Sequence, residues 1–477
     1  MRNVTAREAE TLNNMKKSIK RVFWLIALMF FLILCTLAKI TLIDRNKIAT
    51  NGYNPRLNYS DSSIKRGSIK DSNGQVIAES KKNEDGTYSR IYPRARMAAH
   101  ITGYSSVGKT GIESAENFEL EKVHNEILQR IKNLADGSEI CGNNVVLTID
   151  MDIQSVAGNL LGDKKGAIVA IEPSTGKVLA LQAYPDFDPN TVQQNWDSLR
   201  ENEDSPLLNR ATNGLYPPGS TFKIVTAAAA MEFMSDWESF VYDCKGEAEF
   251  DGKVIHCYNN TVHGQVDMKK AMAVSCNCYF SELAKKINAG KLREVAERLY
   301  FNQSYPFLLG LSQSKVALTE GSSESELVET AIGQGKTVAT PLHMAMLASA
   351  VANGGVMMQP YIVDHIEYPD GKSSHVTMPE QINTIFSVEE TLKLKEMMLE
   401  VVENGTGTAA QISGIIVAGK TGTAENSTGN DHSWFIGFAP ADSPKVAVAV
   451  ILENAGKSSK AAPIAGKVMK AVLDKYN

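Results

Sequence analysis

Residues 216–223, which read Tyr-Pro-Pro-Gly-Ser-Thr-Phe-Lys, decide how the rest of this chain is interpreted. Two prolines and a glycine end the preceding segment, and Ser220 then opens an alanine-rich helix expected from Thr221 to Met234. Positions three apart share one helix face, so Lys223 is expected to reach the Ser220 hydroxyl. With a lowered lysine pKa, this pair suits an activated nucleophile. The same spacing follows Ser62, Ser106, Ser174 and Ser312, so a plain helix N-cap is the alternative for this motif alone.

A second polar motif is Ser275-Cys276-Asn277. It places a hydroxyl and an amide two residues apart, so both can face one cleft if the backbone turns there. Ser275 could then relay a proton, and Asn277 could hold a substrate amide. The alternative is an ordinary polar turn beside a helix.

A third motif, Ala-Gly-Lys-Thr-Gly-Thr-Ala-Glu at residues 418–425, follows a strand expected at residues 415–418. Lys420 adds a second cation, and Gly422 lets a substrate backbone come close. Thr421 and Thr423 offer hydroxyls that can bind a carboxylate.

The specific signal is the set of three motifs in this order. Ser275 follows Ser220 by 55 residues, and Lys420 follows Ser275 by 145 residues. A second Lys-Thr-Gly, at residues 109–111, lies ahead of Ser220 and is interpreted as unrelated to the site.

The strand and helix pattern predicts an α+β fold. Strands are expected at residues 145–149, 166–171, 177–182, 415–418, 433–438 and 445–451, and helices dominate residues 220–350 before a closing helix at 462–476. Strands from both ends of this region can pair into one antiparallel sheet, with the helical middle as a second lobe. The cleft between sheet and lobe is where a site is expected.

The N-terminal part predicts a membrane anchor. Residues 22–43 form an apolar run interrupted by Lys39, long enough to cross a bilayer. Residues 1–21 hold six basic and two acidic side chains, so this tail is expected in the cytoplasm and the rest outside. A cleaved signal peptide is the alternative, but no Ala-x-Ala-like site follows the run. Residues 44–144 then read as a small β-rich pedestal, and residues 145–477 as the catalytic domain.

The overall composition limits the classes of function. The net charge is −5 and the isoelectric point is about 6.0, which argues against nucleic-acid binding. Six cysteines in 477 residues are too few for a disulfide scaffold.

The cysteines nevertheless gather in one region. Cys244 and Cys257 bracket an expected hairpin turn at residues 250–253, and His263, Cys276 and Cys278 follow. Three states remain open: a Cys244–Cys257 disulfide, a zinc site made from these five side chains, or reduced buried thiols. No cofactor is expected for the chemistry at Ser220.

The three motifs together resemble those of penicillin-binding proteins and serine β-lactamases. From residue 22 onward the chain is similar to class B penicillin-binding proteins, which are monofunctional peptidoglycan D,D-transpeptidases. Residues 66–78, 92–100 and 111–113 resemble motifs of that family's pedestal. Gly333-Gln334-Gly335, followed by Thr340-Pro341, resembles the loop beside its active site.

The resemblance implies a role for each motif residue. Ser220 would attack the D-Ala-D-Ala carbonyl with Lys223 as general base, and Ser275 and Lys420 would pass the proton to the leaving amine. The backbone N–H groups of Ser220 and Thr423 would form the oxyanion hole. Thr421 and Thr423 would bind the terminal carboxylate, Gly422 would lie against the substrate, and Asn277 would hold the peptide amide.

The resemblance also implies the partners. These are peptidoglycan stem peptides, β-lactam antibiotics that acylate Ser220, the membrane, and a glycosyltransferase. The glycosyltransferase is expected to be a separate protein, because the residues before 145 leave no room for such a domain in this chain. A role in cell division or cell shape follows. The alternatives are a membrane-anchored D,D-carboxypeptidase or β-lactamase, in which water resolves the acyl-enzyme, and a β-lactam sensor.

Overall fold

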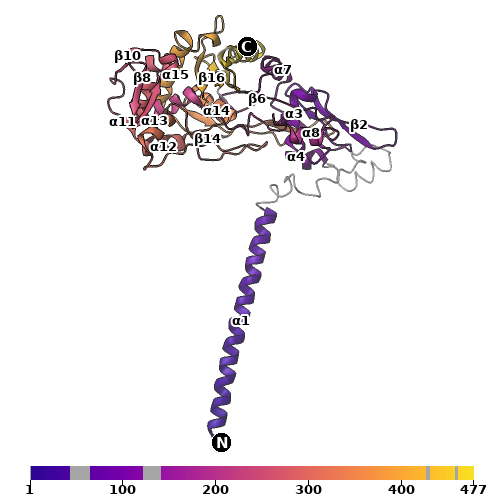
Figure 1. The fold of residues 1–477 in the computed structure, drawn as a ribbon. Helices are drawn as coiled ribbons and strands as arrows, with labels where there is room; N and C mark the ends of the chain where they lie inside the picture. The colour runs from indigo at the N-terminus through magenta and orange to yellow at the C-terminus, as the bar shows by residue number, and fades with distance from the viewer. Residues whose placement is uncertain (1, 43–64, 122–140, 426–429, 457–459, 477) are drawn as a thin grey trace. The chain divides into compact units, whose positions relative to one another are not determined.

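A computed structural model of the chain describes residues 2–42, 65–121, 141–425, 430–456 and 460–476. The chain forms two units, residues 1–60 and residues 61–477. The first described element is the single helix α1, Arg2–Leu42, drawn as one continuous coil in Figure 1. Its segment Met15–Ile40 has a mean hydropathy of 2.4 and is long and apolar enough to cross a membrane. The predicted membrane segment overlaps this helix, and its last residue, 43, lies outside the described residues.

The first strands of the second unit form a hairpin within the β-rich pedestal that the sequence predicts. Strand β1, Ile69–Lys70, pairs antiparallel with β2, Val76–Lys82, across the Asn73-Gly74 turn. These strands join a six-stranded sheet in the order β13-β12-β4-β1-β2-β3. Its other members are β3 Tyr88–Ile91, β4 Asn144–Leu147, β12 Val363–Glu367 and β13 Ser373–Ser374.

Strand β4 corresponds to the strand expected at residues 145–149. It pairs parallel with β1 and antiparallel with β12, so it belongs to the pedestal sheet rather than to the catalytic sheet. Strand β12 comes from far along the chain, and the pedestal sheet is therefore completed by the region that carries the site.

A buried ion-pair network explains two of the pedestal motifs. Glu113 is fully buried and receives Arg66 Nε at 2.7 Å and Arg90 Nε at 2.6 Å. Burial alone would raise the pKa of Glu113, but the two arginines hold it below its usual value. Lys109, from the second Lys-Thr-Gly, pairs with Glu121 at 2.9 Å in this same network, as expected for a copy unrelated to the site.

Four short helical elements complete the described pedestal: η2 Ala95–Ala98, α3 Ala99–Thr102, α4 Gly111–Ala115 and α5 Asn117–Glu121. Residues 122–140 lie outside the described residues.

The predicted antiparallel sheet between the two ends of the catalytic region is confirmed. Its order is β15-β16-β17-β5-β6, with every neighbouring pair antiparallel. The strands are β5 Gly166–Ile171, β6 Val178–Tyr184, β15 Ala418–Ala424, β16 His432–Ala439 and β17 Val446–Leu452. Strand β15 was expected at residues 415–418. This position is wrong, because pairing with β16 begins only at Ala418.

Central strand β17 shows why the sheet needs helices on both faces. All of its residues are buried, and successive side chains of a strand point to opposite faces. Ala447, Ala449 and Ile451 pack with α14, Pro341–Ala352, in one core. Val448 and Val450 pack in a second core, with α7 Met151–Leu161 and the closing helix α16 Ala461–Tyr476.

The helical lobe lies at one end of the second unit, and pedestal elements β2, α3 and α4 lie at the other (Figure 1). Its helices are α9 Lys223–Phe233, α10 Met268–Ala273, α11 Asn277–Ile287, α12 Ala289–Arg298, α13 Glu324–Ala331 and α15 Val388–Glu403. Three strand pairs flank them: β7 Tyr242–Cys244 with β10 Gly264–Val266, β8 Glu247–Phe250 with β9 Lys253–His256, and β11 Val356–Met358 with β14 Gln381–Thr384. The remaining elements are α8 Trp196–Glu201 and the 3-10 turns η3 Gly219–Phe222, η4 Tyr258–Asn260 and η5 Thr408–Ala410.

Candidate active site

Ser220 lies in the 3-10 turn η3, which runs directly into α9 at Lys223. The helix was expected to begin at Thr221, with an N-cap as the alternative role for Ser220. In the structure Ser220 instead lies inside a 3-10 turn that precedes the helix. Gly219 has φ +53°, and a Cβ there would lie 2.4 Å from the Thr423 carbonyl oxygen. Only glycine permits this approach, which holds the Ser220 turn against strand β15.

The two predicted lysines meet at the hydroxyl of Ser275. Lys223 Nζ lies 3.2 Å from Ser275 Oγ, and Lys420 Nζ lies 3.0 Å from the same atom. Lys223 also donates to the Ser275 carbonyl oxygen at 2.8 Å and to Asn277 Oδ1 at 2.7 Å. Residues from three distant motifs therefore converge on one point, as the sequence predicted.

Lys223 was expected to reach the Ser220 hydroxyl, but its amine hydrogen-bonds to Ser275 and Asn277 instead. Among the described residues, the Ser220 side chain makes no hydrogen bond, and Ser275 occupies the position between the lysines. Lys223 follows Ser220 by one helical turn, and catalytic hydrogen bonds often tighten only when substrate binds.

The backbone around Ser275 explains how it reaches this position. Ser275 has φ +57°, and it lies in the turn between α10 and α11. Cys276 then caps α11, because its sulfur accepts the Tyr279 N–H at 3.5 Å. Asn277 Nδ2 donates to the His256 carbonyl oxygen at 2.8 Å, which fixes the amide whose oxygen faces Lys223.

Both lysines are fully buried, and burial disfavours a charged amine. Burial lowers the pKa of Lys223 to about 8, against the opposing effect of nearby cysteine sulfurs. Burial, together with the charge of Lys223, holds the pKa of Lys420 well below its usual value. The site therefore contains amines that can accept a proton near neutral pH.

Strand β15 presents the Lys-Thr-Gly-Thr motif with the alternation expected for a strand. Lys420 and Gly422 are buried, Thr421 is half-buried and Thr423 is exposed. A Cβ at Gly422 would lie 2.9 Å from the Pro218 carbonyl oxygen, so glycine is needed where β15 passes the Ser220 loop. β15 is the edge of its sheet, so its outer backbone groups can pair with an extended ligand.

Several supporting contacts were not predicted from the sequence. Thr406 Oγ1 lies 2.6 Å from Thr421 Oγ1, and the Trp434 indole N–H donates to the Pro217 carbonyl oxygen at 3.0 Å. Glu453 accepts from the Tyr216 hydroxyl at 2.6 Å and pairs with Arg210 at 2.7 Å. In each of the three hydrogen bonds a residue of a predicted motif (Tyr216, Pro217 or Thr421) meets a residue that the sequence did not single out (Thr406, Trp434 or Glu453).

The loop predicted to border the site does so. The Gly219 N–H donates to the Gly333 carbonyl oxygen at 2.9 Å. Gly333 has φ +73°, and a Cβ there would lie 2.0 Å from the Gly219 carbonyl oxygen.

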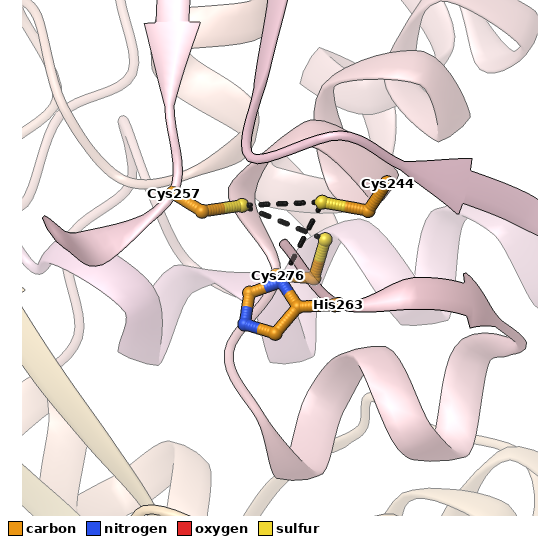
Figure 2. A group of neighbouring side chains, drawn as sticks. All are labelled: Cys244, Cys257, His263 and Cys276. Atoms are coloured by element: carbon orange, nitrogen blue, oxygen red, sulfur yellow. Dashed lines mark hydrogen bonds between the residues drawn. The ribbon is translucent and has the colours of Figure 1, made fainter. Parts of the chain in front are cut away.

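A cluster of cysteines lies directly behind the Ser275 turn. The side chains of Cys244, Cys257, His263 and Cys276 point toward one another (Figure 2), with one potential ligand atom from each, all within 4.8 Å. The predicted hairpin between Cys244 and Cys257 is confirmed as β8 and β9. The fifth predicted member, Cys278, lies 3.5 Å from Cys257 but outside this group of four.

Comparisons with known proteins agree with this geometry. The penicillin binding protein transpeptidase domain matches residues 166–471, and the penicillin binding protein A dimerisation domain matches residues 66–145. The chain is 32% identical to the peptidoglycan D,D-transpeptidase PbpA of Mycolicibacterium smegmatis over 492 residues, covering 96% of this chain and 99% of the relative. It is 31% identical to the transpeptidase MrdA of Acinetobacter baumannii, covering 80% of this chain and 65% of the relative.

Solved structures are similar over the same region. The imipenem acyl-enzyme complex of penicillin-binding protein A from Mycobacterium tuberculosis is 34% identical, with a TM-score of 0.81, and covers 86% of this chain and 99% of that one. A D,D-transpeptidase domain from Eggerthella lenta is 35% identical, with a TM-score of 0.80, and covers 87% of this chain and 99% of that one.

Proposed function

The chain belongs to the class B penicillin-binding proteins, and from this premise we propose that it cross-links peptidoglycan stem peptides through an acyl-enzyme on Ser220. One observation carries the assignment of residues. The amines of two buried lysines meet at the Ser275 hydroxyl, and Lys223 also donates to Asn277. The Ser220 turn is held against the neighbouring strand at Thr423.

Acylation begins when the Ser220 hydroxyl attacks the carbonyl between the two terminal D-alanines. The neutral Lys223 amine takes the hydroxyl proton, and the backbone N–H groups of Ser220 and Thr423 stabilise the oxyanion. Each such donor contributes about 3–4 kcal/mol in acyl transfer. The proton passes through Ser275 and Lys420 to the leaving D-alanine amine, the C–N bond breaks, and an ester to Ser220 remains.

The second half of the reaction transfers the peptide to an amine of another stem peptide. That amine attacks the ester carbonyl, loses its proton to the same relay and restores the Ser220 hydroxyl. A β-lactam enters the first half only, because its strained amide resembles the D-Ala-D-Ala bond and its product remains attached to the serine.

Strand β15 supplies the substrate contacts. The half-buried Thr421 and exposed Thr423 hydroxyls are available to a terminal carboxylate, and Gly422 leaves the strand flat against the Ser220 loop. The Asn277 amide binds the peptide backbone; its contacts with Lys223 and the His256 carbonyl oxygen, which fix its orientation, support this role.

Helix α1 anchors the enzyme, with residues 1–21 in the cytoplasm and the catalytic unit outside. The apolar segment Met15–Ile40 and the basic residues at its N-terminal end support this orientation. A glycosyltransferase partner supplies the glycan strands whose peptides this enzyme joins. Protease added outside intact cells should remove the catalytic unit and leave the N-terminal tail protected.

The activity is tested with the full-length chain in detergent. A D-Ala-D-Ala peptide donor and a separate amine acceptor are supplied, and the products are resolved by mass. The proposal expects donor–acceptor amide and one free D-alanine per bond formed, both absent with Ser220→Ala. Release of D-alanine with only hydrolysed donor, at every acceptor concentration, would identify a carboxypeptidase instead.

A further inference from the structure

Tyr216, at the start of the nucleophile motif, is held by a buried polar network that takes no part in the proton transfers. Glu453, the residue after β17, accepts the Tyr216 hydroxyl on Oε1 at 2.6 Å. The same oxygen pairs with Arg210 Nε at 2.7 Å. Arg210 and Tyr216 are both buried. We propose that Glu453 is a positioning residue that sets the place of the Ser220 hydroxyl through the side chain of Tyr216; this inference rests on the proposed function.

The carboxylate of Glu453 is fixed from two sides. The Glu453 backbone N–H donates to the Lys165 carbonyl oxygen at 2.7 Å, which holds this residue at the end of the central strand. The guanidinium of Arg210 also donates to the carbonyl oxygens of Asp204 at 2.7 Å and Ser205 at 3.0 Å. Several bonds from one planar fork leave the guanidinium a single orientation, so the carboxylate paired with it has a fixed place.

The Tyr216 side chain is held at its tip and around its ring. Burial, together with the charge of Glu453, raises the pKa of Tyr216 well above its usual value, so the hydroxyl stays protonated and donates at every working pH. A hydrogen bond to a carboxylate is about twice as strong as one between neutral groups. The ring makes edge contacts with His432 and Trp434, at 5.7 Å and 6.1 Å between ring centroids.

The segment from Tyr216 to Ser220 transmits this position to the nucleophile. The Tyr216 backbone exchanges two hydrogen bonds with Ala339, at 3.1 Å and 2.8 Å. Pro217 and Pro218 follow, and proline fixes the backbone angle φ at about −65°; Pro218 has φ −72°. Few torsions therefore remain free between the tyrosine and the serine, so a displacement of one displaces the other.

The consequence for the reaction lies in how Ser220 is placed. In the described part of the chain its side chain makes no hydrogen bond, so its hydroxyl takes its place from the backbone that carries it. A misplacement of about 1 Å can cost about a hundredfold in rate. Loss of the Tyr216 hydroxyl should therefore slow the attack on a bound penicillin without weakening the binding that precedes the attack.

The first test is Tyr216→Phe in the full-length chain in detergent, measured by stopped-flow acylation with a fluorescent penicillin. The substitution removes one hydroxyl and leaves Glu453 paired with Arg210. The rate constant of acylation is expected to fall about tenfold, with no change in the dissociation constant of the initial complex or in the final stoichiometry of one adduct per chain. A rate within about twofold of the wild type, or an effect confined to the dissociation constant or the stoichiometry, would overturn the positioning role.

Tyr476→Phe is the matched control. The Tyr476 hydroxyl donates to Asp150 Oδ2 at 2.9 Å, and the same oxygen pairs with Lys475 at 2.6 Å. This variant therefore loses the same kind of hydrogen bond from a network on α16 that does not adjoin the nucleophile motif, and it should acylate at the wild-type rate. Equal slowing in Tyr476→Phe and Tyr216→Phe would show that the effect is general destabilisation, against the proposal.

A double-mutant cycle tests the route from Glu453 to the serine. Glu453→Leu removes the acceptor and should slow acylation about tenfold, whereas Glu453→Gln, which keeps an acceptor oxygen, should recover most of the rate. Added to Tyr216→Phe, Glu453→Leu should slow the reaction by no more than about twofold further, because both changes remove the same hydrogen bond. Effects that multiply to about a hundredfold would contradict this route.

Because these measurements need no cross-linking, their outcome is separable from that of the proposed function. If penicillin acylates Ser220 but no cross-link forms, the transpeptidase proposal fails and the positioning role stands. If cross-links form but Tyr216→Phe acylates at the wild-type rate, only the positioning role fails.

Discussion

The acylation rate should depend on pH through Lys223. This amine is fully buried, and burial lowers its pKa to about 8. A general base must be neutral to accept a proton, so acylation should follow the neutral fraction of Lys223. The perturbation is therefore a change of buffer pH from 6.5 to 9.5 at constant ionic strength, with no change to the protein.

The size of the effect follows from this pKa. With a pKa of about 8, the neutral fraction is about 0.09 at pH 7, about 0.5 at pH 8 and about 0.9 at pH 9. The rate constant of acylation should therefore rise about tenfold between pH 7 and pH 9 and then level off. An ordinary lysine, with a pKa near 10.4, would still be rising at pH 9.5.

The assay is stopped-flow acylation of the full-length chain by a fluorescent penicillin. Lys223→Arg, which stays protonated throughout this range, is the matched control and should acylate slowly at every pH. Melting temperatures over the same range show whether the fold persists. A flat profile, or an inflection near pH 6.5 that indicates a histidine, would refute Lys223 as the base.

Three further changes test separate parts of the structure. Thr406→Val removes the 2.6 Å contact with Thr421 and should weaken donor-peptide binding about two- to tenfold; unchanged binding would show that Thr421 needs no such support. Gly219→Ala places a Cβ 2.4 Å from the Thr423 carbonyl oxygen and should slow acylation about a hundredfold, whereas Gly252→Ala, with φ +75° and nothing within 4 Å, should not. Arg66→Met leaves the buried Glu113 with one partner fewer and should lower the free energy of unfolding by about 3–5 kcal/mol. Arg200→Met, at an exposed pair with Asp197, should change it by less than about 1 kcal/mol, and equal effects would contradict the network.

The sequence predicted the site because its chemistry lies in short motifs. Proline and glycine ahead of Ser220, and glycine within residues 419–422, mark turns and close backbone approaches whatever surrounds them. The order of the motifs then indicated one cleft. Strands β5, β6, β16 and β17 were predicted because they are continuous apolar runs with turn residues at their ends.

The details that were missed depend on contacts between distant segments. The positive φ of Ser275 places its hydroxyl, rather than that of Ser220, between the two lysines, and no local pattern encodes that choice. Strand β4 has an ordinary strand sequence, and only its partners β1 and β12 assign it to the pedestal sheet. Thr406 belongs to no motif, and only its hydrogen bond to Thr421 in the structure indicates that it supports the site.

The position of β15 along the chain was predicted wrongly for a related reason. Residues 415–418 are the more hydrophobic segment, but Ile416 is half exposed and pairing starts at Ala418. The strand continues through a polar, glycine-containing motif because β16 pairs with every residue of it. Sheet pairing thus outweighs the weak strand preference of that segment.

The most direct measurement is the mass of the full-length chain after incubation with penicillin G, followed by peptide mapping, for the wild type and for Ser220→Ala. The account predicts a single added penicilloyl group on the peptide that contains Ser220, and no added mass on the variant. Modification of a different residue, or an adduct that persists in Ser220→Ala, would contradict the central assignment.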